Sequence, residues 1–177
     1  MIFTARLNLQ PISPDDCPSI HAKNCFPEIA KFNTIGIPKN IKDTEELLAP
    51  LFEKQEPENG QQLGWTIRLK EDNSFIGELG IRLSTPKYNK GEIHYSLLPS
   101  HWKGYATEAV KALLHCGMET LGLHRIEAGV HTQNIRSIQL LEKVGMQREG
   151  MHRGILPIRG KWEDNYSYSI LREDGIQ

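Results

Sequence analysis

The residues from Pro99 to Thr107 have the types and spacing expected of an anion-binding helix start. Pro99 ends a strand-like segment, and Gly104 stands where the chain must turn sharply into the following helix. The first amides of a helix have no intrahelical acceptor, and the helix dipole favours a negative charge beside them. Lys103 adds a positive charge, and Thr107 adds a hydroxyl donor. The segment therefore predicts a diphosphate site that needs no metal ion, although an ordinary capped helix would also fit these residues.

Several other chemistries are disfavoured by the sequence. The longer phosphate fingerprints GxxxxGK[ST] and GxGxxG are absent, which argues against a nucleotide triphosphatase or a dinucleotide dehydrogenase. The cysteines show no CxxC spacing and have no neighbouring base in sequence, which disfavours structural zinc, disulfides and an acyl-cysteine route. With 21 basic and 22 acidic side chains, the net charge of -1 gives no reason to expect nucleic acid as a partner. No polybasic block or long apolar stretch predicts a membrane partner.

Hydrophobic periodicity predicts the elements that must position the helix start. Alternation predicts strands over residues 2–9, 65–69, 79–83, 93–97, 125–130, 146–152 and 161–171. Helical spacing predicts helices over residues 43–54, 106–121 and 135–144, with Asp43 and Asn134 as N-caps and a kink expected at Pro50. Together these predict one domain spanning residues 1–177, of α/β (α+β) class. Its central sheet would be mostly antiparallel, with about six to seven strands and helices on both faces.

Several segments, taken together, resemble the GCN5-related N-acetyltransferase (GNAT) superfamily. Pro99 to Val110 resembles its motif A, Q/R-x-x-G-x-G/A, and Asn134 to Met146 resembles its motif B. Residues 4–9, 92–95 and 159–164 resemble the subgroup of ribosomal-protein-alanine and -serine N-acetyltransferases (RimJ/RimL-like). The resemblance covers nearly the whole chain in the right order. It implies acetyl transfer from acetyl-CoA to a primary amine by direct attack in a ternary complex, without a metal.

The resemblance also assigns roles to residues. Glu92 would bind the acceptor ammonium and receive its proton, and Ser137 would donate to the departing thiolate. The acceptor-binding residues implied are Glu92, His94 and Asp164. The cofactor-binding residues implied are Leu97, Leu98, His101, Trp102, Lys103, Gly104, Tyr105, Ala106, Thr107, Asn134 and Ser137.

Each role has a structural alternative. Glu92 could be an exposed strand carboxylate, His94 could fill the cleft, and Asn134 and Ser137 could serve only the helix start. Motif A itself departs from the subgroup's usual Trp-Gly-Lys-Gly-Tyr-Ala. A histidine, His101, occupies the Q/R position, and Trp102 replaces the first glycine, so the rim of the cofactor site is expected to differ.

The expected acceptor is the N-terminal α-amine of a protein or peptide. A small amine, such as a polyamine, an amino sugar or an antibiotic, remains open, as does a non-catalytic acyl-CoA sensor. The weakly patterned stretch 24–42 is expected to line the acceptor cleft. The absence of a secretory pattern at the N-terminus predicts a cytoplasmic protein, and either a monomer or a homodimer is expected.

Overall fold

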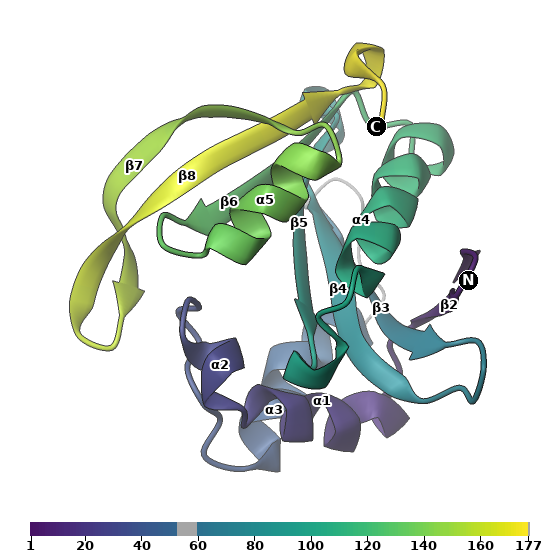
Figure 1. Cartoon of the computed structure of the whole chain (residues 1–177), viewed down its shortest axis with the longest axis vertical. Helices are drawn as coiled ribbons and strands as arrows, with labels where there is room; N and C mark the ends of the chain where they lie inside the picture. Colours follow the sequence, from purple (N-terminus) through teal and green to yellow (C-terminus); the bar gives the residue numbers. More distant parts are fainter. Residues whose placement is uncertain (53–59, 177) are drawn as a thin grey trace.

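One eight-stranded sheet runs through the molecule (Figure 1). The computed structural model describes residues 1–52 and 60–176, and the strand order is β1-β2-β3-β4-β5-β6-β8-β7. The strands are β1 (Ile2–Phe3), β2 (Leu7–Pro11), β3 (Gln62–Leu69), β4 (Phe75–Leu83), β5 (Lys90–Leu97), β6 (Arg125–His131), β7 (Gln147–Ile158) and β8 (Lys161–Leu171). Every neighbouring pair is antiparallel except β5 and β6. The mostly antiparallel sheet is therefore confirmed, with one more strand than expected because residues 4–6 divide the strand predicted over 2–9.

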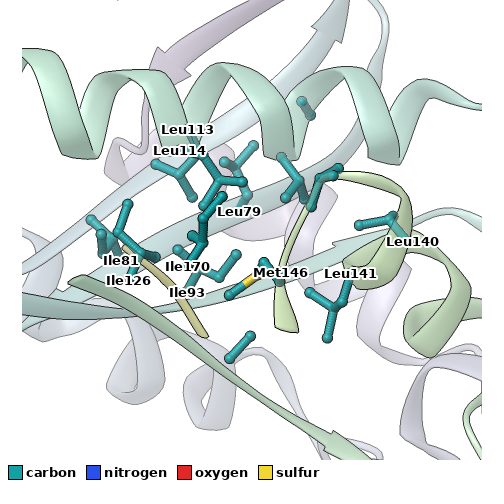
Figure 2. Close-up of a cluster of buried hydrophobic side chains, with 14 of the residues drawn as sticks. Leu79, Ile81, Ile93, Leu113, Leu114, Ile126, Leu140, Leu141, Met146 and Ile170 are labelled. Atoms are coloured by element: carbon teal, nitrogen blue, oxygen red, sulfur yellow. The ribbon is translucent and has the colours of Figure 1, made fainter. Parts of the chain in front are cut away.

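Helices cover both faces of this sheet, as predicted. They are α1 (Cys17–Asn24), α2 (Pro27–Ala30), α3 (Ile41–Leu48), α4 (Tyr105–His115) and α5 (Ile135–Lys143). Because side chains alternate along a strand, Leu79 and Ile81 of β4 face α4 and α5, whereas Glu78 faces α1. Figure 2 shows the α4 and α5 side of the core, where Leu113 and Leu114 lie over the strands near Leu79. Leu140 and Leu141 of α5 lie further to the right, beside Met146.

Three helix predictions need correction. The N-cap of α3 is Asn40, whose side chain accepts from the amides of Lys42 and Asp43, so Asp43 is not the cap. The α-helix ends at Leu48, and a 3₁₀ turn containing Pro50 follows it, which agrees with the expected break. Residues 53 and 54 of that predicted helix lie outside the described residues. The helix predicted over 106–121 is α-helical only to His115 and continues as a π turn over Cys116–Thr120.

The sheet opens between β5 and β6. These parallel strands pair at three positions, from Lys90 with Arg125 to Glu92 with Glu127. Beyond Glu92, β5 stays paired with β4 as far as Leu97, while β6 follows β8, and Figure 1 shows the two strands diverging. In an antiparallel ladder, the amides and carbonyls of alternate residues face opposite neighbours. Since the Leu98 amide donates to Ile76 O at 2.8 Å, the polar groups of Tyr95 and Leu97 face the gap towards β6.

Candidate active site

The start of α4 presents unpaired backbone amides. Gly104 is its N-cap residue, in the left-handed conformation with φ of 87°, which a residue with a side chain adopts only under strain. The first amide of the helix with a backbone acceptor is that of Glu108, which donates to Gly104 O at 3.3 Å. Within the described chain, the amides of Tyr105, Ala106 and Thr107 have no such acceptor. This helix start therefore has the free amide donors that the predicted anion site requires, and anion binding itself stays a prediction.

The turn between β1 and β2 holds the first turn of α4 in place. The Glu108 carboxylate accepts from Thr4 Oγ1 at 2.6 Å and from the Arg6 amide and Nε at 2.8 and 2.7 Å. The Arg6 guanidinium also lies 4.4 Å from the centre of the Tyr105 ring. Although burial opposes ionisation, the hydrogen bonds from Thr4 and Arg6 hold the pKa of Glu108 below its usual value. No local pattern in the sequence predicts this clamp, because its partners come from distant parts of the chain.

A cavity of about 720 Å³ opens beside this helix start, where β5 and β6 diverge. Its wall comes from the end of β5, the loop before α4, the first turns of α5 and the segment around α2. The lining residues are Glu28, Ile29, Lys31, Phe32, Tyr95, Ser96, Leu97, Trp102, Gly104, Ala106, Thr107, Gln133, Asn134, Ile135, Arg136, Ser137, Gln139, Leu140 and Lys143. The stretch 24–42 therefore supplies four lining residues, in line with its predicted position at the cleft.

Two hydroxyl groups meet on the wall of this cavity. Tyr95 Oη lies 2.6 Å from Ser137 Oγ, and Asn134 caps α5 by accepting from the Ser137 amide at 3.3 Å. Burial raises the pKa of Tyr95 to about 12, against the opposing effect of the Ser137 hydrogen bond, so the phenol keeps its proton at neutral pH. Tyr95 lies in the strand expected over 93–97, but the sequence did not predict its pairing with Ser137. The only signal was a phenol among aliphatic residues, which requires a polar partner when buried.

An anion-binding helix start, a gap between parallel strands and a hydroxyl pair thus share one cavity. The family model described as "Acetyltransferase (GNAT) domain" matches residues 6–147 of this chain. The chain belongs to the GNAT acetyltransferase family. It is accordingly an N-acetyltransferase that uses acetyl-CoA.

Some known proteins similar to this GNAT chain have names that give no acceptor, and the names of others give different acceptors. An uncharacterized N-acetyltransferase, p20, of Bacillus licheniformis is 30% identical over 174 residues, which cover 98% of this chain and 97% of that protein. The [ribosomal protein uS5]-alanine N-acetyltransferase of Escherichia coli is 33% identical over 72 residues, or 41% of this chain and 37% of that enzyme. The fold also matches the spermidine N-acetyltransferase of Vibrio cholerae in complex with CoA and spermine, with a TM-score of 0.83, 21% identity and coverage of 95% and 96%.

Seven of the predicted cofactor-binding residues line the cavity. They are Leu97, Trp102, Gly104, Ala106, Thr107, Asn134 and Ser137. Four others, Leu98, His101, Lys103 and Tyr105, are not among the lining residues, and the cofactor-binding roles of all eleven stay predictions.

Trp102, where motif A departs from the family pattern, bridges two walls of the cavity. Its indole Nε1 donates to Leu97 O at 2.9 Å, and the Arg136 guanidinium stacks 4.3 Å from the centre of its ring. The tryptophan therefore occupies a carbonyl on the open edge of β5 and links the loop before α4 to α5.

The predicted acceptor residues have partners away from the cavity. Glu92 forms an ion pair with Arg82, and the His94 ring lies against Gly80, where an added Cβ would come within 2.6 Å of the imidazole. Asp164 Oδ1 accepts from the Gly154 amide at 2.7 Å, within an irregular part of the β7–β8 pairing. None of the three is among the residues that line the cavity, and their catalytic or binding roles stay predictions.

Two features of the described residues concern a membrane and metal ions. No helix in the described part of the chain combines the length and apolar character needed to cross a membrane. Over the same residues, no three histidine, cysteine, aspartate or glutamate side chains gather as metal ligands would. The cytoplasmic location and the oligomeric state remain predictions.

Proposed function

We propose that this protein transfers the acetyl group of acetyl-CoA to the N-terminal α-amine of a protein or peptide, by direct attack in a ternary complex. The observation that carries the proposal is the cavity shared by the unpaired amides of α4 and the Tyr95–Ser137 hydroxyl pair. The amides of Tyr105 to Thr107 suit the pyrophosphate of the coenzyme. The gap between β5 and β6 then leaves room for its extended arm. The backbone amide and carbonyl of Tyr95 and the amide of Leu97 face this gap, whereas Leu97 O already accepts from Trp102.

The Tyr95–Ser137 hydroxyl pair has a proton available for the leaving thiolate. One of its two protons is used in the hydrogen bond between Tyr95 Oη and Ser137 Oγ, and the other is left to donate. As the amine nitrogen attacks the thioester carbon, the C–N bond forms, the C–S bond breaks, and the sulfur takes this proton. The amine must lose a proton in turn, which calls for a base on the acceptor side of the cavity.

Two considerations support an α-amine as the acceptor. Its unperturbed pKa of about 7.7–8.0 leaves a larger neutral fraction than that of a lysine, at about 10.4, so it requires less help from a base. The partial similarity to the ribosomal-protein-alanine N-acetyltransferase points the same way. Direct attack in a ternary complex requires only that the enzyme hold the two substrates in the correct orientation. A single cavity lined by β5, the start of α4, α5 and the segment around α2 can do so.

The test is acetyl transfer to a panel of peptides, polyamines and aminoglycosides, measured by release of free thiol. We expect transfer to a peptide α-amine, and a large loss of turnover in Ser137→Ala with retained binding of acetyl-CoA by thermal shift. Transfer to a small amine alone would overturn the proposed acceptor. Stabilisation by acetyl-CoA without thiol release on any amine would indicate a sensor and overturn catalysis.

A further inference from the structure

A buried lysine lies directly behind the cavity wall. Lys23, on α1, is 1% exposed, and its Nζ is 2.8 Å from Glu78 Oε1. The same ammonium donates to Asn24 Oδ1 at 2.6 Å and to Ser96 Oγ at 2.9 Å. An ammonium has three hydrogens to donate, so these three acceptors satisfy it completely. Lys23 is therefore fixed in place, and it in turn fixes the side chains of Glu78 and Ser96.

Glu78, by contrast, is only half satisfied. Its side chain is 15% exposed, and its Oε2 is buried without a hydrogen-bond partner. Among the residues described, it is the one buried side-chain nitrogen or oxygen atom in this condition. A buried carboxylate oxygen without a partner costs free energy and calls for an explanation, such as a bound water or a catalytic role.

Ser96 connects this pair to the cavity. Ser96 and Glu78 are directly opposed across the β4–β5 ladder, and Ser96 lines the cavity next to Tyr95 and Leu97. Because Ser96 Oγ accepts from Lys23, its own hydroxyl proton remains free to donate. The buried carboxylate therefore lies one residue behind the surface that bound substrates would touch.

We propose that Glu78 receives the proton of the acceptor amine through one water held beside Ser96, with Lys23 as its positioning residue. This inference rests on the proposed function and assigns the base that the reaction requires. The neutral amine attacks the thioester carbon, and the proton it releases passes through the water to Glu78 Oε2. The sulfur leaves with its bonding electrons and takes the proton of the Tyr95–Ser137 pair, so protons and electrons balance.

The electrostatics of the site agree with this role. Burial raises the pKa of Glu78, with the charge and hydrogen bond of Lys23 opposing the shift. A raised pKa makes the carboxylate a stronger base near neutral pH. Lys23 also disfavours a second positive charge nearby, so an acceptor amine would bind in its neutral, nucleophilic form. Among the residues described, the charged and polar side chains on this face of the sheet include Thr66 and Arg68 on β3, Arg82 on β4, and Glu92 and His94 on β5. Asp16, at the start of α1, is paired with Arg68.

The decisive experiment compares wild-type protein with Glu78→Gln, which keeps an oxygen for Lys23 but cannot accept a proton as a base. We expect kcat/KM for the amine to fall by about 10²–10⁴-fold, the range of general-base catalysis, with the KM for acetyl-CoA unchanged. On the acidic side of the pH profile, log kcat/KM rises as the base loses its proton. In the variant this slope should fall by one unit, because one titrating group has been removed. The matched control is Asp16→Asn, which alters a partly buried ion pair with Arg68 away from the cavity and should leave the pH profile unchanged.

A second variant separates catalysis from folding. In Lys23→Met/Glu78→Leu, both charges are removed together, which similar buried pairs tolerate without loss of stability. A folded double variant with the same loss of kcat/KM would support the proposal. Wild-type kcat/KM in either variant would overturn it. Absence of transfer by the wild-type protein itself would instead overturn the proposed function.

Discussion

Two ion pairs on the same face of the sheet, both involving β4, show that a glutamate's environment depends on where along the strands it lies. Arg82 and Glu92 lie where β5 is still paired with β6, and their side chains are 63% and 44% exposed. Lys23 and Glu78 lie where β5 has left β6, and their side chains are 1% and 15% exposed. The first pair is exposed to solvent, whereas the second is largely buried. Only the second borders the cavity, through Ser96.

The comparison shows that solvent access, rather than charge, separates the two glutamates. An exposed pair gains little because water screens it, whereas a buried pair depends on each partner to offset the desolvation of the other. Desolvation is also what strengthens a carboxylate as a base.

Lys23→Met should produce the largest loss of stability. It leaves the Glu78 carboxylate buried without its counter-charge, which typically costs about 3–5 kcal/mol. Urea denaturation monitored by circular dichroism would measure the loss, and Lys23→Met/Glu78→Leu should recover most of it. A single variant as stable as the wild type would show that the pair is not buried as described.

Substituting the two glutamates should reduce activity to different extents. Glu78→Gln should reduce kcat/KM for the amine at least about tenfold more than Glu92→Gln, because only the Glu78 carboxylate lies behind the cavity wall. Steady-state kinetics on the same acceptor would rank the two variants. A larger loss in Glu92→Gln would reverse the ranking and support the role that sequence resemblance gave to Glu92.

Removing the Glu108 carboxylate should cause an intermediate loss of stability, because its partner Arg6 is half exposed while Glu108 is mostly buried. Glu108→Gln should lower the free energy of unfolding by about 1.5–3 kcal/mol at neutral pH, the usual value for hydrogen bonds to a charged group. Since folding lowers the pKa of Glu108, its contribution is complete above the usual carboxyl pKa and is lost as pH falls through the lowered value. The wild-type advantage over the variant, followed by denaturation across pH, should therefore shrink in acid. An advantage that does not change with pH would contradict the clamp.

Arg82→Ala should have the smallest effect. The pair that it breaks is exposed, so we expect a change of about 0–1 kcal/mol in the free energy of unfolding, reduced further by salt. Thermal denaturation at low and high ionic strength would measure it. A loss as large as that of Lys23→Met would remove the distinction between the two pairs.

Local patterns were sufficient for much of the fold and for one half of the site. Asn134 caps α5 as predicted, and Gly104 stands at the start of α4 in the conformation that its sequence context demands. Both depend on short-range backbone geometry, which a few neighbouring residues control. The strand predicted over 161–171 agrees with β8 for the same reason, since its alternation is regular.

The acceptor half of the site could not be found in this way. Glu78 alternates with apolar residues along β4 and so looks like any polar strand residue, and Lys23 lies in a helix with weak patterning. Their meeting depends on how α1 packs against β4, which no local periodicity encodes. Tyr95 lies in a strand that the alternation predicted, but its partner Ser137 is supplied by a later helix.

The sequence by itself determined the family, the order of the elements and the helix start that suits a pyrophosphate, because these follow from motifs and periodicities within short stretches of chain. The tertiary structure decided which side chains lose water. Burial is a property of the assembled sheet and helices, and the cost of desolvating a charge is what distinguishes Glu78 from Glu92. The assignment of a base to this enzyme therefore depends on packing, whereas the assignment of its cofactor depends on a motif.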